Sequence, residues 1–420
     1  MAKIRTRPEE FQVDEFYPEG ESIFIEDRTS PYRIFKLTKI GWETQALVSK
    51  ISKKHGIPVD AWGFSGLKDR RSKTTQLVSF SSRHAPKNTI SGKDWTLEPH
   101  GTFHRHLKSG DHSGNRFTIV VRDIRHRETQ LLPSRIEQIS SIGLPNWFDS
   151  QRFGSAAIGK LPGDLLMRGD LVGAMKLHLT ETQPSDRSSR RRDKKYLKSI
   201  WPNIHEARSD YIDYRPFRRV IEAWKSPLKS ANQKKSLPQS SLSAYLALPR
   251  RLRGLWISAW QSHIWNDVLR NTLLEKIENH LLRPVDIGVG GPLLYPEAPP
   301  GRRGYAKRSL VDYLSRSLKQ IPASIRMPVP SMVNEPSTGD PMISRIHSNP
   351  PHPDIDLDQL KIKMADFSRD TVLFPKEILS SELVIDDMHG SPKHKRWTCK
   401  ISFTLPPGAY ATNVIRRLFD

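Results

Sequence analysis

The chain has 420 residues, and its 67 Lys and Arg residues exceed its 45 Asp and Glu residues, which gives a formal net charge of +22. Its single cysteine excludes a disulfide framework and a multi-cysteine metal site within the chain, and we expect a reducing, cytoplasmic location. No apolar run approaches the roughly 18 residues of a membrane helix. We expect no secretory signal at an N-terminus that becomes acidic at Glu9.

So large a net charge repels itself in a compact chain and therefore favours a polyanionic partner. Nucleic acid is the first candidate. A membrane surface is the second, and it is disfavoured because the basic residues do not gather on one long amphipathic helix. At roughly 150 residues per domain, the length predicts two or three domains.

The first part of the chain, up to about residue 155, alternates between predicted strands and helices. Residues 22–25, 32–37, 77–80 and 116–121 are rich in branched and aromatic side chains and are predicted strands. Residues 42–55 have apolar side chains at helical spacing, and Gly56 can end that helix. Ser134 and Glu137 form a capping-box pattern that predicts the start of a second helix, which Gly143 would end.

The middle of the chain, about 160–350, is richer in proline and carries basic runs at 187–195, 215–235 and 302–308. The first run lies in a Ser-rich stretch, which predicts a mobile segment. Residues 252–282 have the pattern of a long amphipathic helix, and its Trp256 and Trp260 are predicted to be core residues. Residues 334–358 are rich in Pro and Ser, which predicts a linker or surface loop.

The last part returns to strand character. Residues 397–405 alternate strictly between apolar and polar side chains, so they predict a strand in which Cys399 is a small buried hydrophobe and not a nucleophile. By this pattern both ends of the chain form one α/β domain, which an inserted middle domain interrupts.

Familiar cofactor and metal signatures do not fit. The glycines of 288–292 match neither the dinucleotide fingerprint nor a P-loop, which predicts a simple turn. His100, His104, His106 and His112 have none of the zinc spacings, and we expect solvated or RNA-facing histidines there.

Two segments have the composition of a reaction site. In 63–76, Gly63 and Gly66 allow a tight turn that presents Asp69 among basic neighbours, which favour an ionised carboxylate available as nucleophile or base. The alternative is a surface aspartate that only balances positive charge. In 145–154, three aromatic residues, two amides and an arginine can stack a base and bind its edges. The alternative is an ordinary loop anchored by its aromatic residues.

Together these segments resemble the TruD family of pseudouridine synthases. The family's Gly-x-Lys-Asp motif, followed by a basic residue and then by Thr and Gln, matches Gly66 to Arg70 with Thr74 and Gln76. Its second motif matches residues 146–154, and weaker matches keep the family's order at 8–15, 39–44, 107–118, 258–266 and 405–412. The sequence departs from the family at Trp147, where Tyr is usual, at Asp149-Ser150, and at Arg5, where bacterial relatives carry Lys.

The resemblance implies an α+β fold: a pseudouridine-synthase catalytic domain with a mostly antiparallel sheet and flanking helices, interrupted by an inserted α/β TRUD domain. The implied bounds are 1–157 and 361–420 for the catalytic domain and 158–360 for the insertion. The implied activity is isomerisation of a tRNA uridine, at position 13 in bacterial members, by a monomer that needs no cofactor, metal or membrane. The alternatives are a synthase for another RNA, a catalytically silent RNA-binding protein on this scaffold, and a structural ribosome-associated protein.

The resemblance also implies roles for single residues. Asp69 would attack C1′ of the ribose or remove the C2′ proton, and Arg5 would pair with it. Phe148 would stack the uracil, and Asn146 would orient Asp69 or the base. The implied substrate-binding residues are Phe11, which would wall the pocket, Lys68, Arg70, Gln151 and Arg152.

Overall fold

The computed structural model of the protein describes residues 2–17, 29–183, 186–226, 236–301, 305–328, 341–348, 352, 356 and 358–420. The chain divides into two compact units. The first comprises Met1–Leu144, Glu297–Ser315 and Leu373–Asp420, and the second comprises Pro145–Pro296 and Arg316–Val372. The predicted strand at 22–25 lies outside the described residues, and the domain bounds implied by the resemblance stay a prediction.

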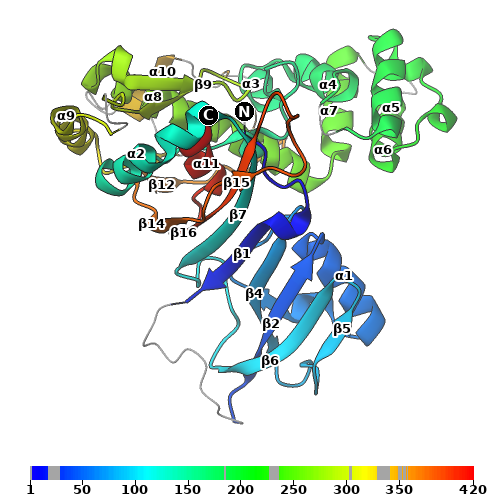
Figure 1. The fold of residues 1–420 in the computed structure, drawn as a ribbon. Coiled ribbons are helices and arrows are strands. Elements are labelled where there is room, and N and C mark those ends of the chain that lie inside the picture. Colours follow the sequence, from blue (N-terminus) through cyan, green and yellow to red (C-terminus); the bar gives the residue numbers. More distant parts are fainter. Residues whose placement is uncertain are drawn as a thin grey trace. The chain divides into compact units, whose positions relative to one another are not determined.

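The first unit is built on one large sheet. Its strands are β1 (Phe11–Phe16), β2 (Tyr32–Ile40), β3 (Trp62–Phe64), β4 (Lys73–Ser81), β5 (Ile90–Gly92), β6 (Trp95–Phe103), β7 (Gly114–Ile124), β14 (Lys376–Ser380), β15 (Val384–Ile385) and β16 (Trp397–Leu405). The order is β14-β16-β7-β1-β4-β2-β6-β5, with β15 on β16 and β3 on β4 (Figure 1).

Within the described residues, β1 and β4 form the one parallel pair of this sheet, and its other pairs are antiparallel. The fold is therefore α+β, as the resemblance implies. The α/β interpretation drawn from the residue pattern is wrong, because a parallel sheet would need a helical crossover at each step and this sheet does not.

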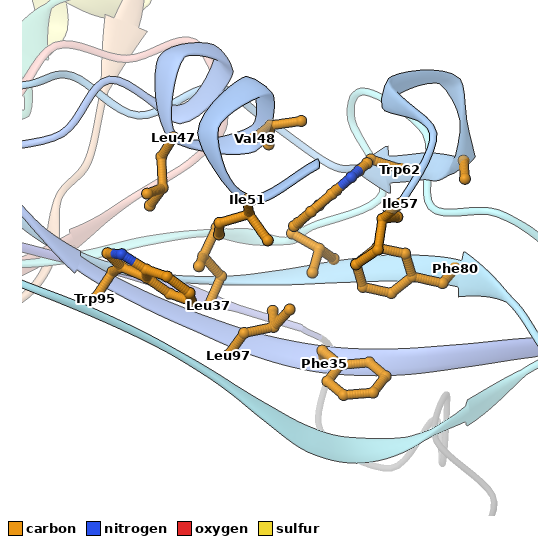
Figure 2. Close-up of a cluster of buried hydrophobic side chains, with 12 residues drawn as sticks. Phe35, Leu37, Leu47, Val48, Ile51, Ile57, Trp62, Phe80, Trp95 and Leu97 are labelled. Carbon is orange, nitrogen blue, oxygen red and sulfur yellow. The ribbon is translucent and has the colours of Figure 1, made fainter. Parts of the chain in front are cut away.

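One face of the sheet is covered by α1 (Thr44–His55), which confirms the predicted helix with a start two residues later. Leu47 and Ile51 of this helix point towards the sheet, and with Val48 they form one buried cluster with Leu37 of β2 and Leu97 of β6 (Figure 2). Gly56 ends the helix with a left-handed φ of 69°, a conformation that glycine adopts without steric cost. The buried cluster anchors β2, which carries residues of the site described below.

The predicted helix start at Ser134 is wrong. Helix α2 runs His126–Ile142, and Ser134 is a buried residue in its interior. The helix begins earlier because the backbone N–H of Arg125 donates to the Glu128 carboxylate at 2.6 Å. The C-terminal helix α11 (Ala411–Phe419) packs against α2, and Arg135 of α2 donates to the carbonyl oxygen of Leu418 at 2.9 Å.

The second unit is mainly helical. It contains η3 (Ser150–Phe153), α3 (Pro162–Met167), α4 (Leu171–Thr180), α5 (Ser188–Ser199), α6 (Arg215–Lys225), α7 (Leu237–Ala247), α8 (Arg250–Lys276) and α10 (Pro341–Ser348). Two small antiparallel sheets pair β9 (Leu282–Val285) with β10 (Leu293–Pro296), and β11 (Ser324–Met327) with β12 (Phe367–Asp370). The boundaries between the units fall within β8 (Leu144–Pro145), directly after β10, and within α9 (Arg308–Lys319) and β13 (Val372–Leu373).

Three predictions for the middle of the chain need correction. The basic run at 187–195, expected to be mobile, forms the N-cap and first part of α5, because the buried side chains of Asp186, Asp193 and Leu197 anchor this helix. The predicted loop at 334–358 contains α10, which packs on α8 through apolar residues. The long helix ends at Lys276, and residue 282 already belongs to β9. Part of the other two basic runs, 227–235 and 302–304, lies outside the described residues.

Other predictions are confirmed. Trp256 and Trp260 of α8 are buried core residues, and residues 288–292 lie in the connection between β9 and β10. Cys399 is buried in β16, and that burial raises the pKa of its thiol to about 11. In the part of the chain that the structure describes, no helix is long and apolar enough to cross a membrane.

Candidate active site

Asp69 lies in the loop between β3 and β4, and its side chain is 61% exposed. The backbone of the loop is fixed by Lys39, a fully buried lysine of β2. The Lys39 ammonium donates to the carbonyl oxygens of Trp42 at 2.6 Å, Lys68 at 3.4 Å and Asp69 at 3.3 Å. Burial lowers the pKa of Lys39 to about 8, and the charge of Asp69 opposes that shift. The carboxylate of Asp69 is therefore exposed, while hydrogen bonds from Lys39 hold the backbone of its loop.

Thr44 and Gln76 support the same loop from a second position. The backbone N–H of Lys68 donates to the Thr44 hydroxyl at 3.0 Å, and this hydroxyl donates to the side-chain oxygen of Gln76 at 2.9 Å. The amide of Gln76 then donates to the carbonyl oxygen of Gly66 at 3.0 Å. Both side chains are buried, so this series of hydrogen bonds is shielded from water and restrains the loop.

The two glycines before Asp69 serve close packing, and the chain reverses between the antiparallel strands β3 and β4 without a positive φ at either glycine. Gly63 lies within β3, and neither Gly63 nor Gly66 has a positive φ. A Cβ at Gly63 would collide with the hydroxyl of Ser79. A Cβ at Gly66 would lie 3.3 Å from both Oε1 of Glu15 and Nζ of Lys68. The absence of a side chain lets the loop lie directly on its neighbours.

Arg5 reaches Asp69 from the N-terminal segment. Its Nη2 lies 3.4 Å from Oδ2 of Asp69, and its guanidinium carbon lies 4.0 Å from the ring centroid of the buried Phe11. The Arg5 backbone has a φ of 61°, a left-handed conformation that costs free energy for a residue other than glycine. Such a conformation persists only where the surrounding structure enforces it.

Contacts on both sides of Arg5 enforce it. Lys3 and Arg122 of β7 exchange two backbone hydrogen bonds of 2.8 Å. On the other side, the backbone N–H of Arg7 donates to Glu10 at 3.2 Å. The guanidinium of Arg122 donates to Glu10 at 2.9 Å and so joins the two anchors. Arg122 therefore fixes the segment that carries Arg5.

Lys68 forms a buried ion pair. Its ammonium lies 2.5 Å from Oε1 of Glu15, and the Tyr17 hydroxyl donates to Oε2 of Glu15 at 3.1 Å. Burial raises the pKa of Tyr17, and the charge of Glu15 adds to the shift. Arg70 is exposed, and its Nε donates to the carbonyl oxygen of Gly41 at 3.3 Å. Substrate contact by Lys68 and Arg70 stays a prediction.

The histidine cluster is not uniformly solvated, which corrects that expectation. His112 is buried, and burial lowers its pKa. Nδ1 of His106 lies 3.1 Å from the Ser79 hydroxyl, and burial lowers its pKa as well. Among the described residues, no group of three or more His, Cys, Asp or Glu side chains could hold a metal ion.

The second motif lies in the second unit, where Asn146 is bound to the strand β12 and the residue after it. Its backbone N–H donates to Thr371 at 2.8 Å, and its amide donates to the carbonyl oxygen of Asp370 at 2.9 Å. Arg369 donates through Nη2 to the side-chain oxygen of Asn146 and through Nε to its carbonyl oxygen at 2.9 Å. Both ends of the Asn146 amide are therefore occupied.

Phe148 is fixed by a pair of hydrogen bonds from α8. Its backbone N–H donates to Oδ1 of Asn266 at 3.0 Å, and Nδ2 of Asn266 donates back to its carbonyl oxygen at 2.8 Å. The buried ring packs edge-on against Trp265 and Phe367 at centroid distances of 5.4 and 5.9 Å. The guanidinium of Arg369 lies 4.2 Å from the ring centroid, a cation–π contact.

The departures from the family motif have local explanations. Trp147 is fully buried, and its indole N–H donates to the carbonyl oxygen of Leu294 at 3.2 Å. Asp149 caps η3 by accepting from the backbone N–H of Ser150 at 2.7 Å. Within η3, Arg152 donates to the Ser262 hydroxyl at 3.0 Å, whereas Gln151 is exposed.

The structure places Asp69, Arg5, Phe11, Lys68 and Arg70 in the first unit, and it places Asn146, Phe148, Gln151 and Arg152 in the second unit. Their roles in substrate binding and catalysis stay predictions.

Sequence reasoning did not assign several residues that hold these site residues in place. Lys39 could have been found, because it follows Leu37 by two positions on the buried face of β2, where a lysine is unexpected. Asn266 is a buried amide on the apolar face of α8, and an unexpected polar residue there is a weaker sequence signal than the lysine of β2. Arg122 and Arg369 have no local signal, because their partners are distant in sequence.

The chain matches the family model "tRNA pseudouridine synthase D (TruD)" over residues 1–418. It is 28% identical to "Probable tRNA pseudouridine synthase D 1" of Methanococcus maripaludis, with 100% of this chain and 99% of that protein covered. It is 26% identical to "tRNA pseudouridine synthase D" of Leptospira interrogans, with 99% and 95% covered.

A crystal structure from Methanosarcina mazei, described as a putative tRNA pseudouridine synthase D, has a similar fold. Its TM-score is 0.60 at 22% identity, and the match covers 100% of this chain and 93% of that one. The family model spans nearly the whole chain, and both site motifs lie within it. The chain therefore belongs to the TruD family of tRNA pseudouridine synthases.

Proposed function

We propose that this protein isomerises one uridine of a tRNA to pseudouridine, with Asp69 as the catalytic carboxylate and position 13 as the target. Membership of the TruD family supports the reaction, and the names of its relatives support tRNA as the substrate. The observation that favours a catalytic role for Asp69 is the way in which buried residues hold its loop. Buried Lys39, Thr44 and Gln76 fix the loop backbone while the carboxylate remains exposed.

The chemistry needs one carboxylate and no redox step. The bond from ribose C1′ to uracil N1 breaks, the base turns, and a bond from C1′ to C5 forms. C5 then loses its proton, and N1 gains one. Asp69 either attacks C1′ or removes the C2′ proton. Arg5, at 3.4 Å, orients the carboxylate, and its own position is set by Phe11 and the N-terminal anchors.

The target uridine must leave its stack, which costs a few kcal/mol that contacts to the rest of the RNA supply. We propose that Phe148 stacks the released uracil and that Asn146 helps to orient it. The remaining predicted contacts are those of Lys68, Arg70, Gln151 and Arg152. Rigid support favours this assignment, because Asn266 holds the Phe148 backbone through two hydrogen bonds.

The test is to incubate the purified protein with unmodified tRNA transcripts and to map pseudouridine along each RNA. We expect one modified position in transcripts with uridine at position 13, and none in transcripts with cytidine there. A modified uridine elsewhere in the tRNA would replace the proposed position and keep the reaction. Binding without any product from a broad RNA pool would instead support a silent RNA-binding protein.

A further inference from the structure

A cavity of about 240 Å³ lies within the second unit, beside the end of the second motif. Its wall includes Gly154 and Ser155, which directly follow η3, together with residues of α4, α5, α6 and α8. None of the proposed catalytic residues lines it. The cavity is smaller than the roughly 300–1,000 Å³ of pockets for drug-sized ligands, so it suits a group of about the size of one nucleobase.

One polar side chain in the wall is buried without a hydrogen-bond partner among the described residues. It is the Ser155 hydroxyl, and 4% of this residue is exposed. His178 also lines the cavity, and it packs its ring edge-on against Phe217 and Trp256 at centroid distances of 5.5 and 5.4 Å. A buried polar group without a partner is costly and calls for a ligand or water. Burial also lowers the pKa of His178 to about 3, so its imidazole is neutral and offers one donor and one acceptor.

The charged side of the cavity carries a net positive charge. Arg190 and Lys194 of α5 both line it, and both bind the buried Asp186, at 3.3 and 2.9 Å. One carboxylate thus faces two cations. Exposed basic residues on the same helix, Arg191 and Lys195, add to the charge. This charge favours an anionic group such as a phosphate.

Other residues of the cavity wall are apolar. They include Phe217 at the start of α6, and Leu252 and Leu255, which are half-buried on α8. The wall therefore combines apolar side chains, neutral donors and acceptors, and cationic groups. This combination matches a nucleotide, whose base has a flat face and polar edges and whose phosphate is negative.

We propose that this cavity binds one nucleotide of the RNA substrate, other than the uridine that is isomerised, with its base inside and its phosphate towards α5. The RNA as source of the nucleotide rests on the proposed function. The nucleotide chemistry does not, because a free nucleoside monophosphate would satisfy the same groups.

The first test fills the cavity with Leu252→Trp. The matched control is Leu274→Trp on the same helix, since Leu274 is 44% exposed and does not line the cavity. Dissociation constants are measured for the nucleoside 5′-monophosphates and for a tRNA transcript, and thermal melting checks the fold. We expect Leu252→Trp to raise both dissociation constants about 10-fold or more, and the control to leave them unchanged.

The single-turnover rate at saturating RNA should be the same in Leu252→Trp as in the parent. If only the dissociation constant for the monophosphate rises, the cavity binds a free nucleotide. The nucleotide site is then supported, and its use by the RNA is not. If Leu252→Trp folds and changes neither constant relative to Leu274→Trp, the proposal is overturned. Because the monophosphate titration needs no turnover, its failure is distinct from failure of the proposed reaction.

Ser155→Ala gives a second, independent reading that does not depend on a bulky side chain. Removing a hydroxyl without a partner should leave the melting temperature equal or higher, while it weakens nucleotide binding. A residue with a purely structural role would not separate the two quantities in this way. Unchanged binding of monophosphate and RNA by Ser155→Ala would count against the site.

Discussion

The ammonium group of Lys39 lies 3.3 Å from the carbonyl oxygen of Asp69, so the proposed catalytic residue is held by its backbone while its side chain remains in solvent. The same ammonium binds the carbonyl oxygens of Trp42 and Lys68. A buried cation is costly unless its donors are all used, and here three carbonyl groups use them. This arrangement leads to separate predictions for the Asp69 carboxylate and for Lys39, which holds its loop.

Asp69→Asn should abolish pseudouridine formation while RNA binding survives, because an amide of similar shape can act neither as nucleophile nor as base. Product is measured by mapping pseudouridine, and binding is measured by titration with the same RNA. Arg71→Gln is a control for loss of charge in the same loop, since Arg71 is exposed and has no predicted role in the site. Appreciable turnover by purified Asp69→Asn would remove Asp69 from its role.

Lys39→Met should lower the single-turnover rate with little effect on RNA affinity. It removes the Lys39 donor from the carbonyl oxygen of Trp42, and it removes one of several donors from those of Lys68 and Asp69, which Thr44 and Ser72 also bind. An unsatisfied buried carbonyl group costs about 1–3 kcal/mol, so the loop and the whole unit lose stability. Lys36→Met is the matched control, because Lys36 is an exposed residue of the same strand. Equal rates and equal unfolding free energies in the two variants would contradict the supporting role.

The lowered pKa of Lys39, about 8, predicts a pH effect of defined sign. Above pH 8 and below the usual value near 10.5, the unfolded chain binds more protons at this group than the folded chain does. The contribution of Lys39 to the free energy of unfolding therefore rises with pH over this window. The difference in unfolding free energy between the parent and Lys39→Met should follow that rise in denaturant titrations, and a flat or falling difference would contradict it.

Over the same window Lys39 loses one of its three N–H donors, so the Asp69 loop is held less firmly. We expect the single-turnover rate of the parent to fall as the pH rises through about 8, and the rate of Lys39→Met to lack that limb. The two pH profiles, measured at saturating RNA, test this. Parallel profiles would assign the alkaline limb to another group.

Activity should resist chelators and need no added nucleotide or flavin, because the isomerisation involves neither redox chemistry nor phosphate transfer. The measurement is product formation after dialysis against a strong chelator, with untreated protein as the control. Complete loss of activity that zinc restores would show that the histidines of 100–112 hold a metal after all.

Replacing Arg187, Arg191 and Lys195 by Gln should weaken binding of different RNAs alike and flatten its salt dependence. Arg191 and Lys195 are exposed on α5 and Arg187 is exposed at its N-cap, whereas Arg190 and Lys194 bind Asp186. Each lost phosphate contact should change the slope of log K against log salt by about 0.7 to 0.9.

The control for that charge change replaces Lys53, Lys54 and Lys87 by Gln, exposed residues of the first unit. The single-turnover rate at saturating RNA should be unchanged in the α5 variant. If the salt slope of the α5 variant equals that of the parent, α5 does not contact RNA.

The sequence predicts elements whose signal is local. The alternation at 397–405 and the apolar spacing that ends at Gly56 both produce the expected strand and helix. The Ser134–Glu137 pattern predicts too late a start for the helix at 126–142, because the backbone N–H of Arg125 donates to Glu128 one turn from the true start. Sheet order could not be predicted from residues, since β1 pairs with strands that are distant in sequence.

In the candidate site, too, residues with a local signal could be predicted, and residues held by distant contacts could not. Asp69 and Phe148 could be named from motifs, because a motif reports which residues recur together. The supporting contacts could not, because the link from Arg122 to Glu10 joins residues more than 100 positions apart and depends on the sheet register. Even Lys39, which the motif contains, shows its purpose only when the carbonyl groups around it are in place.

The buried thiol of Cys399 makes the protein suitable for site-specific labelling. It is the only cysteine of the chain, and its pKa of about 11 leaves almost no reactive thiolate at neutral pH. Cysteines introduced at exposed positions, one in each unit, would therefore take up fluorescent dyes without background from the native thiol. Energy transfer between two such dyes could follow the distance between the two units as RNA binds.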